Sequence, residues 1–229
     1  FLPNMQIVDT SLALDHSKKP VPHIAYFDRN AGEIKYARYR ISGWVIESVD
    51  QVTEDGAYFP MRLDSNDHPH LSYYHVEEGL KYATSDGEEW QLQIVDEGPG
   101  IGLYPDLALD EDGSPHISYY DQNEGVLKYA PLVGETWVLQ VVDANEDVGM
   151  YTSIAVDPKG HILISYYDAP NGALKFAVGK EDQWRIETID SEGEDVGQHN
   201  SLAVDSLGQP HLSYYDKEVR NLKYTVGVK

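Results

Sequence analysis

Two charged side chains, Arg62 and Asp106, stand at positions where similar segments of the sequence carry small residues. Arg62 takes the place of an alanine, and Asp106 takes the place of a serine. A guanidinium binds a carboxylate or another anion through parallel hydrogen bonds, and a nearby carboxylate can orient such a ligand. The two residues therefore predict a ligand-binding pair. The structural alternative, which stays open, is that Asp106 neutralises a buried Arg62.

Three further residues are candidates for acid–base chemistry if the chain is an enzyme. His75 replaces the aspartate that ends similar Tyr-Tyr-Asp segments, and His199 replaces an aromatic residue at the end of a loop. Imidazole is the side chain whose ordinary pKa lies nearest neutrality, so His75 and His199 are the natural proton donors or acceptors. Tyr58 completes this catalytic set.

Aromatic residues recur at the ends of four long loops, each two positions after a glycine. Loops on a rigid scaffold carry most binding sites, so we expect these rings to contact a ligand together with Arg62 and Asp106. The glycines are Gly56, Gly102, Gly149 and Gly197, and the residues that follow them are Tyr58, Tyr104, Tyr151 and His199.

Four equivalent histidines could in principle converge on a metal ion, because imidazole suits zinc and iron. The equivalent place in the fourth copy is Leu163, which breaks the set. We therefore interpret these histidines as hydrogen-bonded structural residues and expect no metal site. They are His23, His70, His116 and His211.

The segments that carry these residues repeat about every 47 residues. A period in this range is typical of propellers and solenoids. Each copy contains four short runs rich in β-branched and aromatic residues, separated by Gly, Pro, Asp and Asn, which predicts four strands. The copies cover residues 10–50, 51–96, 97–143, 144–190 and 191–229, the last together with residues 5–9.

The repeats predict an all-β fold, a five-bladed β-propeller with four antiparallel strands per blade, in one domain over residues 1–229. The last copy lacks its fourth strand, and the N-terminal sequence MQIVD resembles the other fourth strands. We expect this N-terminal strand to complete the last blade and close the ring, which removes exposed sheet edges. A linear solenoid is the alternative. In a propeller the loop aromatics surround one mouth of the central channel.

Several repeated polar residues have structural explanations. The aspartate that ends each first strand, such as Asp110, can cap the turn after it. The lysine of each third strand lies opposite the aspartate that ends the second strand, which predicts cross-strand pairs. The cross-strand pairs are Lys128 with Asp121 and Lys175 with Asp168.

The Tyr-Tyr doublets are expected to fill the spaces between blades.

The repeat pattern SLAxD, PHISYYD, GxLKYA resembles a repeat of bacterial and archaeal surface or secreted proteins, a resemblance that covers nearly the whole chain and implies no activity. The run Ser85–Trp90 resembles the Asp-box turn of sialidase-type propellers. Blade number and repeat length are similar to those of tachylectin-2-type five-bladed lectins. These resemblances imply a propeller, while function must be argued from the site.

The amino-acid composition disfavours several classes of partner. The chain has 39 acidic and 17 basic residues and a formal charge of −22, which disfavours nucleic acid. It has no cysteine, hence no disulfide or thiolate chemistry, and no long apolar run, so we expect no membrane insertion. An extracellular or cell-surface location fits the acidity and the resemblance. The oligomeric state stays open.

Two functions follow from these residues. We expect a non-enzymatic propeller that binds a small molecule or glycan at the channel mouth, and the alternative is a polysaccharide-active hydrolase or lyase with one asymmetric site there. No cofactor is expected, although acidic loop residues could hold Ca²⁺. Those residues are Glu54, Asp55, Glu146, Asp147, Glu192, Glu194 and Asp195.

Overall fold

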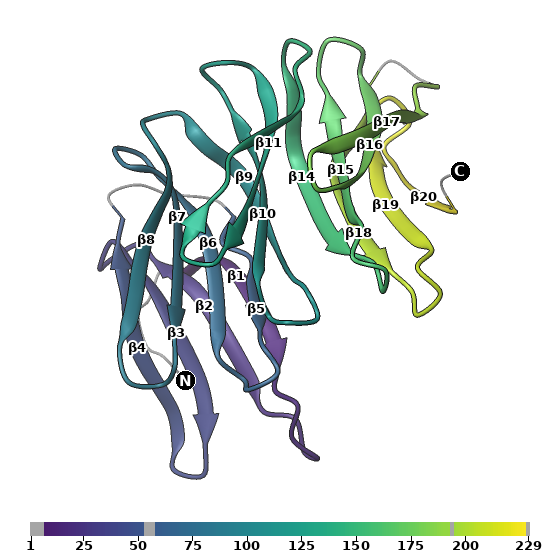
Figure 1. The fold of residues 1–229 in the computed structure, drawn as a ribbon. Helices are drawn as coiled ribbons and strands as arrows, with labels where there is room; N and C mark the ends of the chain where they lie inside the picture. The colour runs from purple at the N-terminus through teal and green to yellow at the C-terminus, as the bar shows by residue number, and fades with distance from the viewer. Residues whose placement is uncertain (1–6, 53–57, 193–194, 228–229) are drawn as a thin grey trace. The chain divides into compact units, whose positions relative to one another are not determined.

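The computed structural model describes residues 7–52, 58–192 and 195–227 of the chain. These residues form twenty β-strands in antiparallel sheets joined by turns and loops, as Figure 1 shows. None of them belongs to a helix that could cross a membrane. The chain divides into two compact units, residues 1–102 and 103–229, and the division falls within β9.

The first unit holds two sheets of four strands each, in the orders β1-β2-β3-β4 and β5-β6-β7-β8. Each strand pairs with the next one along the chain, so every sheet is a meander built from local connections. The strands are β1 (Ile7–Leu14), β2 (Pro22–Asp28), β3 (Glu33–Arg40), β4 (Gly43–Gln51), β5 (Met61–Leu63), β6 (Pro69–His75), β7 (Gly79–Ser85) and β8 (Trp90–Glu97).

The second unit holds three sheets of the same construction. The fourth strand of the third sheet is broken in two, and the described part of the last sheet has three strands, β18-β19-β20. The strands are β9 (Ile101–Leu109), β10 (Pro115–Asp121), β11 (Val126–Val133), β12 (Thr136–Trp137), β13 (Gln140–Asp143), β14 (Val148–Val156), β15 (Ile162–Asp168), β16 (Ala173–Lys180), β17 (Gln183–Asp190), β18 (Val196–Val204), β19 (Pro210–Asp216) and β20 (Asn221–Val226).

The N-terminal strand differs from the expectation that residues 5–9 complete the last sheet. Ile7 and Val8 pair with Asp28 and Phe27 of β2, so they belong to the first sheet. A left-handed residue, Asp9 with φ 51°, interrupts the register there and lets the segment continue along β2. Pairing with a neighbour so close in sequence requires little loop-closure entropy. Residues 5 and 6 lie outside the described residues.

The turn between the first two strands of a sheet is held by the aspartate predicted to cap it. Asp110 Oδ1 accepts hydrogen bonds from the backbone N–H groups of Asp112 and Ser114, at 3.0 and 2.8 Å. Asp64 and Asp157 cap their turns in the same way, with donors two and four residues further on. These side chains replace ladder bonds that the turning backbone cannot make.

Tyrosine and tryptophan side chains fill the spaces between neighbouring sheets. Trp90 of the second sheet meets Tyr36 of the first edge to face, with ring centroids 5.3 Å apart. Trp184 meets Tyr129 in the same way between the fourth and third sheets, also at 5.3 Å. The first tyrosine of each doublet is buried, as Tyr119 illustrates. Aromatic rings in this arrangement add to the free energy gained by burial alone.

A clamp of one aspartate, one tyrosine and one lysine joins consecutive sheets in each unit. Its charged members are buried at Asp143 and Lys175 and partly exposed at Asp190 and Lys223. In the first unit, Asp50 at the end of β4 accepts hydrogen bonds from Tyr73 Oη at 2.7 Å and Lys81 Nζ at 2.6 Å. Both donors belong to the second sheet. The clamp therefore fixes the fourth strand of one sheet against the second and third strands of the next.

The same clamp occurs twice in the second unit. Asp143 accepts hydrogen bonds from Tyr166 Oη at 2.7 Å and Lys175 Nζ at 2.6 Å. Asp190 occupies the equivalent place for the last sheet, with Tyr214 Oη at 2.8 Å and Lys223 Nζ at 2.9 Å.

The cross-strand pairs expected for the third-strand lysines are present but are only part of the arrangement. Lys128 lies 2.6 Å from Asp121, which confirms that pair. Lys175 lies 3.7 Å from Asp168 but 2.6 Å from Asp143, so its closer partner belongs to the neighbouring sheet.

Burial and hydrogen bonding oppose each other at the clamp. Burial alone would raise the pKa of Asp143, but the hydrogen bonds from Lys175 and Tyr166 outweigh it and hold the pKa below its ordinary value. Burial and the neighbouring carboxylate raise the pKa of Tyr166, so its hydroxyl stays protonated and donates. The clamp therefore keeps one positive and one negative charge in the folded protein.

Replacing Asp143 by alanine should lower the free energy of unfolding by about 3 kcal/mol, because it leaves the buried Lys175 without its closest carboxylate. Urea denaturation measures this change. Asp182→Ala removes an exposed carboxylate of the same unit and should change the free energy by less than about 0.5 kcal/mol. Equal effects of the two substitutions would contradict the clamp.

The clamp should also be sensitive to acid. Since the folded pKa of Asp143 lies below its unfolded value, its contribution to stability is present above the unfolded pKa and is lost as the pH falls through the folded pKa. The stability difference between wild type and Asp143→Ala should be constant from about pH 5 to 8 and shrink below about pH 4. Urea titrations across this pH range measure the difference in the free energy of unfolding between the two proteins. A difference that grows in acid would contradict the conclusion that the folded protein lowers the pKa of Asp143.

Candidate ligand-binding site

Three of the residues predicted to bind ligand lie side by side in the second unit. The ring of Tyr151 lies between those of Tyr104 and His199, with centroid distances of 4.7 and 4.5 Å. His199 is exposed, while the two tyrosines are half-buried. We call Tyr104, Tyr151 and His199 the aromatic arc.

The backbone of the aromatic arc is left-handed at every member. The φ angles of Tyr104, Tyr151 and His199 are 50°, 52° and 49°. For a bulky residue this conformation is uncommon, and it costs on the order of 1–3 kcal/mol at each position. The pairing register shifts there, between Met150 and Ser153 in the fourth sheet. A bulge of this kind re-aims a side chain, and it recurs at His199, between Gln198 and Ser201.

Asn200 holds the left-handed backbone at Tyr151 from the neighbouring strand β18. Its Nδ2 donates to the carbonyl oxygen of Tyr151 at 2.7 Å and to that of Gly197 at 3.1 Å. Its Oδ1 accepts a hydrogen bond from the Ser165 hydroxyl. Because Asn200 is buried, these bonds are made away from competing water.

The glycines two positions before the arc residues are required by close packing. Gly149 and Gly197 have φ angles of 113° and 106°. A Cβ atom on Gly149 would lie 2.8 Å from Leu127 Cα, and one on Gly197 would lie 2.8 Å from Leu174 Cα. Gly102 approaches Leu80 in the same way within the first unit. Gly56 lies outside the described residues.

Asp106 is occupied by donors of its own unit. Its Oδ1 accepts the Leu107 N–H at 2.8 Å, and its Oδ2 accepts the Ser153 hydroxyl at 3.0 Å and the Ile154 N–H at 2.9 Å. A carboxylate offers about four acceptor positions, so most of its capacity is used to join β9 to β14. This favours a structural role for Asp106.

The other predicted site residues lie in the first unit. Arg62 is half-buried, and its Nη1 donates to the Met61 carbonyl at 3.1 Å. Its pairing with Asp106 would join the two units and stays a prediction. Tyr58 is 40 % exposed and left-handed, with φ 73°, like the arc residues.

His75 acts as a turn cap in the described structure. Its Nδ1 accepts the N–H groups of Glu77 and Glu78 at 3.4 and 3.2 Å. Asp28 and Asp121 do the same at the equivalent turns. The geometry therefore gives His75 a structural role, and acid–base catalysis by this residue stays a prediction.

Sequence reasoning missed Asp9, which has the left-handed conformation of the arc residues. Asp9 precedes Asp15 by six positions, as Tyr104 precedes Asp110 and Tyr151 precedes Asp157. This spacing could have identified it, but the absence of a preceding Gly-x pattern hid the match. The first sheet thus has a carboxylate where other sheets present a ring.

The four repeated histidines are hydrogen-bonded, as expected, and the partner of each is a tyrosine. Each Nδ1 lies 2.5–2.7 Å from a tyrosine hydroxyl, and burial lowers the pKa of His70 to about 4. Within residues 7–52, 58–192 and 195–227, no three His, Asp or Glu side chains gather closely enough to hold a metal ion. The pairs are His23 with Tyr36, His70 with Tyr82, His116 with Tyr129 and His211 with Tyr224.

Two of the acidic loop residues considered for Ca²⁺ already have internal partners. Asp147 accepts the Tyr120 hydroxyl at 2.7 Å. Asp195 accepts the Tyr167 hydroxyl at 2.6 Å and Lys217 Nζ at 2.6 Å. Glu54, Asp55 and Glu194 lie outside the described residues. The structure therefore gives Asp147 and Asp195 a role in fixing the loops.

No protein-family model matches the sequence, and a search of curated proteins finds no match. Among solved structures, the lectin of Aleuria aurantia in complex with alpha-methyl-L-fucoside has a TM-score of 0.65 and 13% identity, over 97% of this chain and 76% of the lectin. The fold of that lectin is described as a six-bladed β-propeller.

Two enzymes have similar folds. An ulvan lyase of polysaccharide lyase family PL25 has a TM-score of 0.66 and 14% identity, over 93% of this chain and 68% of the lyase. A GH43_1 enzyme from Xanthomonas citri has a TM-score of 0.55 and 11% identity, over 98% and 89%. At these identities the likeness shows the fold alone, so the chain has an all-β fold of the propeller type. The Asp-box and tachylectin-2 resemblances stay predictions.

Replacing Gly149 by alanine should destabilise the second unit by about 3 kcal/mol, because the new Cβ collides with the Leu127 backbone. Urea denaturation measures the loss. Gly160→Ala is the matched control: Gly160 also has a positive φ, 76°, but its Cβ would meet nothing within 4 Å, so the cost should be about 1 kcal/mol. Equal costs would show that the close approach does not matter.

Proposed function

We propose that the chain is a non-enzymatic carbohydrate-binding protein, that its five sheets are the blades of a five-bladed propeller, and that the aromatic arc is its binding surface. Tyr104, Tyr151 and His199 would contact the sugar ring. Tyr58 and Arg62 of the first unit are proposed as further ligand contacts, and Asp106 as a support for the arc.

The observation that carries this proposal is the continuity of three aromatic side chains on a strained, hydrogen-bonded backbone. Strain at three equivalent positions is retained only where the surrounding structure imposes it, and such strain gathers at ligand sites. The non-polar C–H face of a pyranose packs on an aromatic ring, while tyrosine hydroxyls can hydrogen-bond to its polar edge. A partly exposed row of rings suits a saccharide better than a deeply buried apolar ligand.

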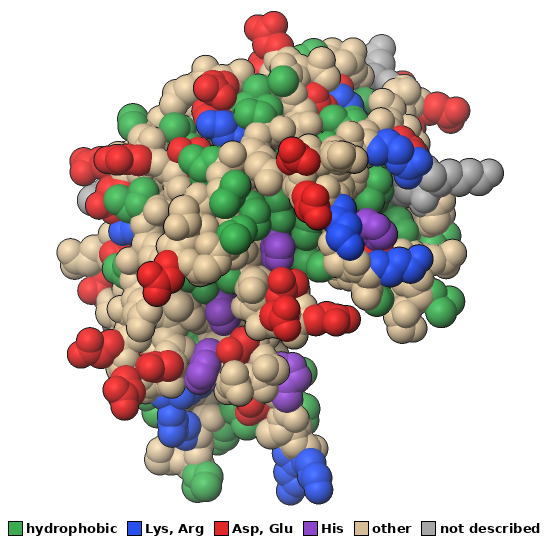
Figure 2. Space-filling model, in the orientation of Figure 1, with side chains coloured by type: hydrophobic (Ala, Val, Ile, Leu, Met, Phe, Trp, Pro, Cys, Tyr) green, Lys and Arg blue, Asp and Glu red, His purple; other side chains and the backbone are tan. Residues whose placement is uncertain are grey.

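Charge and fold support the same class of ligand. Figure 2 shows acidic side chains spread over the visible face, in keeping with the net charge of −22. Such a surface repels nucleic acid and suits neutral sugars, whose hydroxyls donate to carboxylates. The lectin of similar fold is described in complex with a fucoside, and one enzyme of similar fold is described as a polysaccharide lyase. We propose an extracellular or cell-surface location on the same grounds.

The alternative function is cleavage of a polysaccharide. It is favoured by the exposed His199, an acid–base group in contact with Tyr151, and by the presence of a lyase among the similar folds. In that case Tyr58 and His75 are the further catalytic candidates. Mass analysis of a bound glycan distinguishes the two functions, because binding leaves it intact and catalysis shortens it.

Tyr151→Ala should weaken the binding of a glycan, selected on a glycan array, by at least about tenfold, because Tyr151 is the centre of the arc. Tyr151→Phe keeps the ring and should retain most of the affinity. Isothermal titration calorimetry gives both dissociation constants.

The matched control is Tyr224→Ala, which removes another exposed tyrosine that contacts a histidine, His211, in the last sheet. It should leave glycan affinity unchanged. If Tyr151→Ala binds the glycan as tightly as the wild type, or if Tyr224→Ala weakens binding as much as Tyr151→Ala does, the aromatic arc is not the binding surface.

A further inference from the structure

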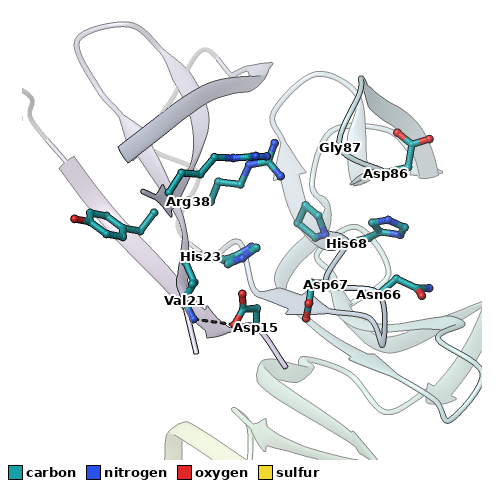
Figure 3. Close-up of a pocket in the computed structure, with 12 residues that line it drawn as sticks. Asp15, Val21, His23, Arg38, Asn66, Asp67, His68, Asp86 and Gly87 are labelled. Atoms are coloured by element: carbon teal, nitrogen blue, oxygen red, sulfur yellow. Dashed lines mark hydrogen bonds between the residues drawn. The ribbon is translucent and has the colours of Figure 1, made fainter. Parts of the chain in front are cut away.

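A second site lies within the first unit, in a pocket of about 320 Å³ between the first and second sheets. We propose that this pocket binds a sugar acid, meaning a polyhydroxylated ring with one carboxylate. Its charged and polar lining includes Arg38, Arg40, Asn66, Asp67 and Asp86. We call it the arginine pocket. Figure 3 shows Arg38 extending from the first sheet toward the segment that carries Asp67 and His68.

The two arginines are a local departure from the repeat. Arg38 and Arg40 lie two residues apart on β3, so both side chains project from the same face of the sheet. The chain has only six arginines among its 229 residues. Other copies have no arginine at these positions; the second has Thr84 and Asp86, and the fourth has Val178 and Lys180. Packing between sheets therefore does not require the pair.

The arginine pair is suited to an anion. Two guanidiniums on one face repel each other, and a bound carboxylate relieves this repulsion through parallel hydrogen bonds. The contact of Arg38 with Glu47 is long, 3.4 Å, and its buried Nε has no hydrogen-bond partner among the described residues. Arg40 is exposed at the pocket.

The carboxylates of the pocket hold other groups rather than the arginines. Asp67 Oδ1 accepts the backbone N–H of His16 at 2.9 Å and lies 2.7 Å from His16 Nδ1. Asp86 Oδ1 accepts the N–H of Glu88 at 3.1 Å. Both have acceptor positions left for ligand hydroxyls, because a carboxylate has about four.

The balance of charge selects the ligand class. The lining contains two guanidiniums, three carboxylates from Asp15, Asp67 and Asp86, and two histidines, so a doubly charged anion such as sulfate meets about twice the repulsion that a single carboxylate meets. In a sugar acid, the single carboxylate can accept hydrogen bonds from the arginines, and the hydroxyls of the uncharged ring can donate hydrogen bonds to the aspartates. The volume lies at the lower end of the range of small-ligand pockets, which fits one sugar ring.

The test is calorimetric titration of the whole chain with D-glucuronate, D-glucose and sulfate. Glucuronate should bind, and glucose and sulfate should bind at least about tenfold more weakly. Arg40→Gln should weaken glucuronate binding by at least about tenfold without lowering the melting temperature, because Arg40 is exposed. Lys180→Gln, which makes the same charge change at the equivalent position of the fourth sheet, should leave binding unchanged.

Asp86→Asn tests the contribution of the hydroxyl contacts. The amide oxygen can still accept the Glu88 N–H, so the turn should survive, while the affinity for glucuronate should fall and that for acetate should not. Equal binding of glucose and glucuronate, binding of sulfate as tight as that of glucuronate, or no effect of Arg40→Gln would each overturn the proposal. So would the absence of glucuronate binding.

Discussion

The ion pair between an aspartate at the end of one sheet and a lysine inside the next is the interaction on which the rest of the structure depends. Burial of Tyr and Leu side chains drives the sheets together but does not fix their register, since the hydrophobic effect has no direction. The bonds from Lys175 and Tyr166 to Asp143 do fix it, at 2.6 and 2.7 Å. Removing any member leaves a buried polar group unmatched.

The aromatic arc depends on this registration. Tyr151 is strained, and its carbonyl oxygen is held by Asn200, which belongs to the next sheet. A bond of 2.7 Å between two sheets requires that their separation be set elsewhere, and the clamp from Asp190 to Tyr214 and Lys223 sets it. The conformation of the arc also requires Gly149, because only a residue without Cβ allows the backbone of β14 to lie so close to Leu127. Packing between sheets and the proposed ligand-binding surface are thus linked through the same strands.

The sequence was sufficient to predict the repeated strands, the buried tyrosines and a hydrogen-bonded role for the repeated histidines, because these follow from period and position. It did not predict that tyrosines are the partners of the histidines, because that contact depends on side-chain geometry. The clamp was missed although Asp50, Asp143 and Asp190 each end a fourth strand. Their partners come from another sheet, and sequence spacing within a copy does not show contacts between copies. Residues 7–9 were misplaced because MQIVD resembles a fourth strand, while pairing with β2 is the more local choice.

The central claim is that a sugar ring packs on the aromatic arc. The most direct measurement is a crystal structure of the chain with a glycan that it binds in solution. We predict that the sugar lies over Tyr151, between Tyr104 and His199, with the left-handed backbone of these residues unchanged. A glycan bound elsewhere, with the three rings untouched, would contradict the account.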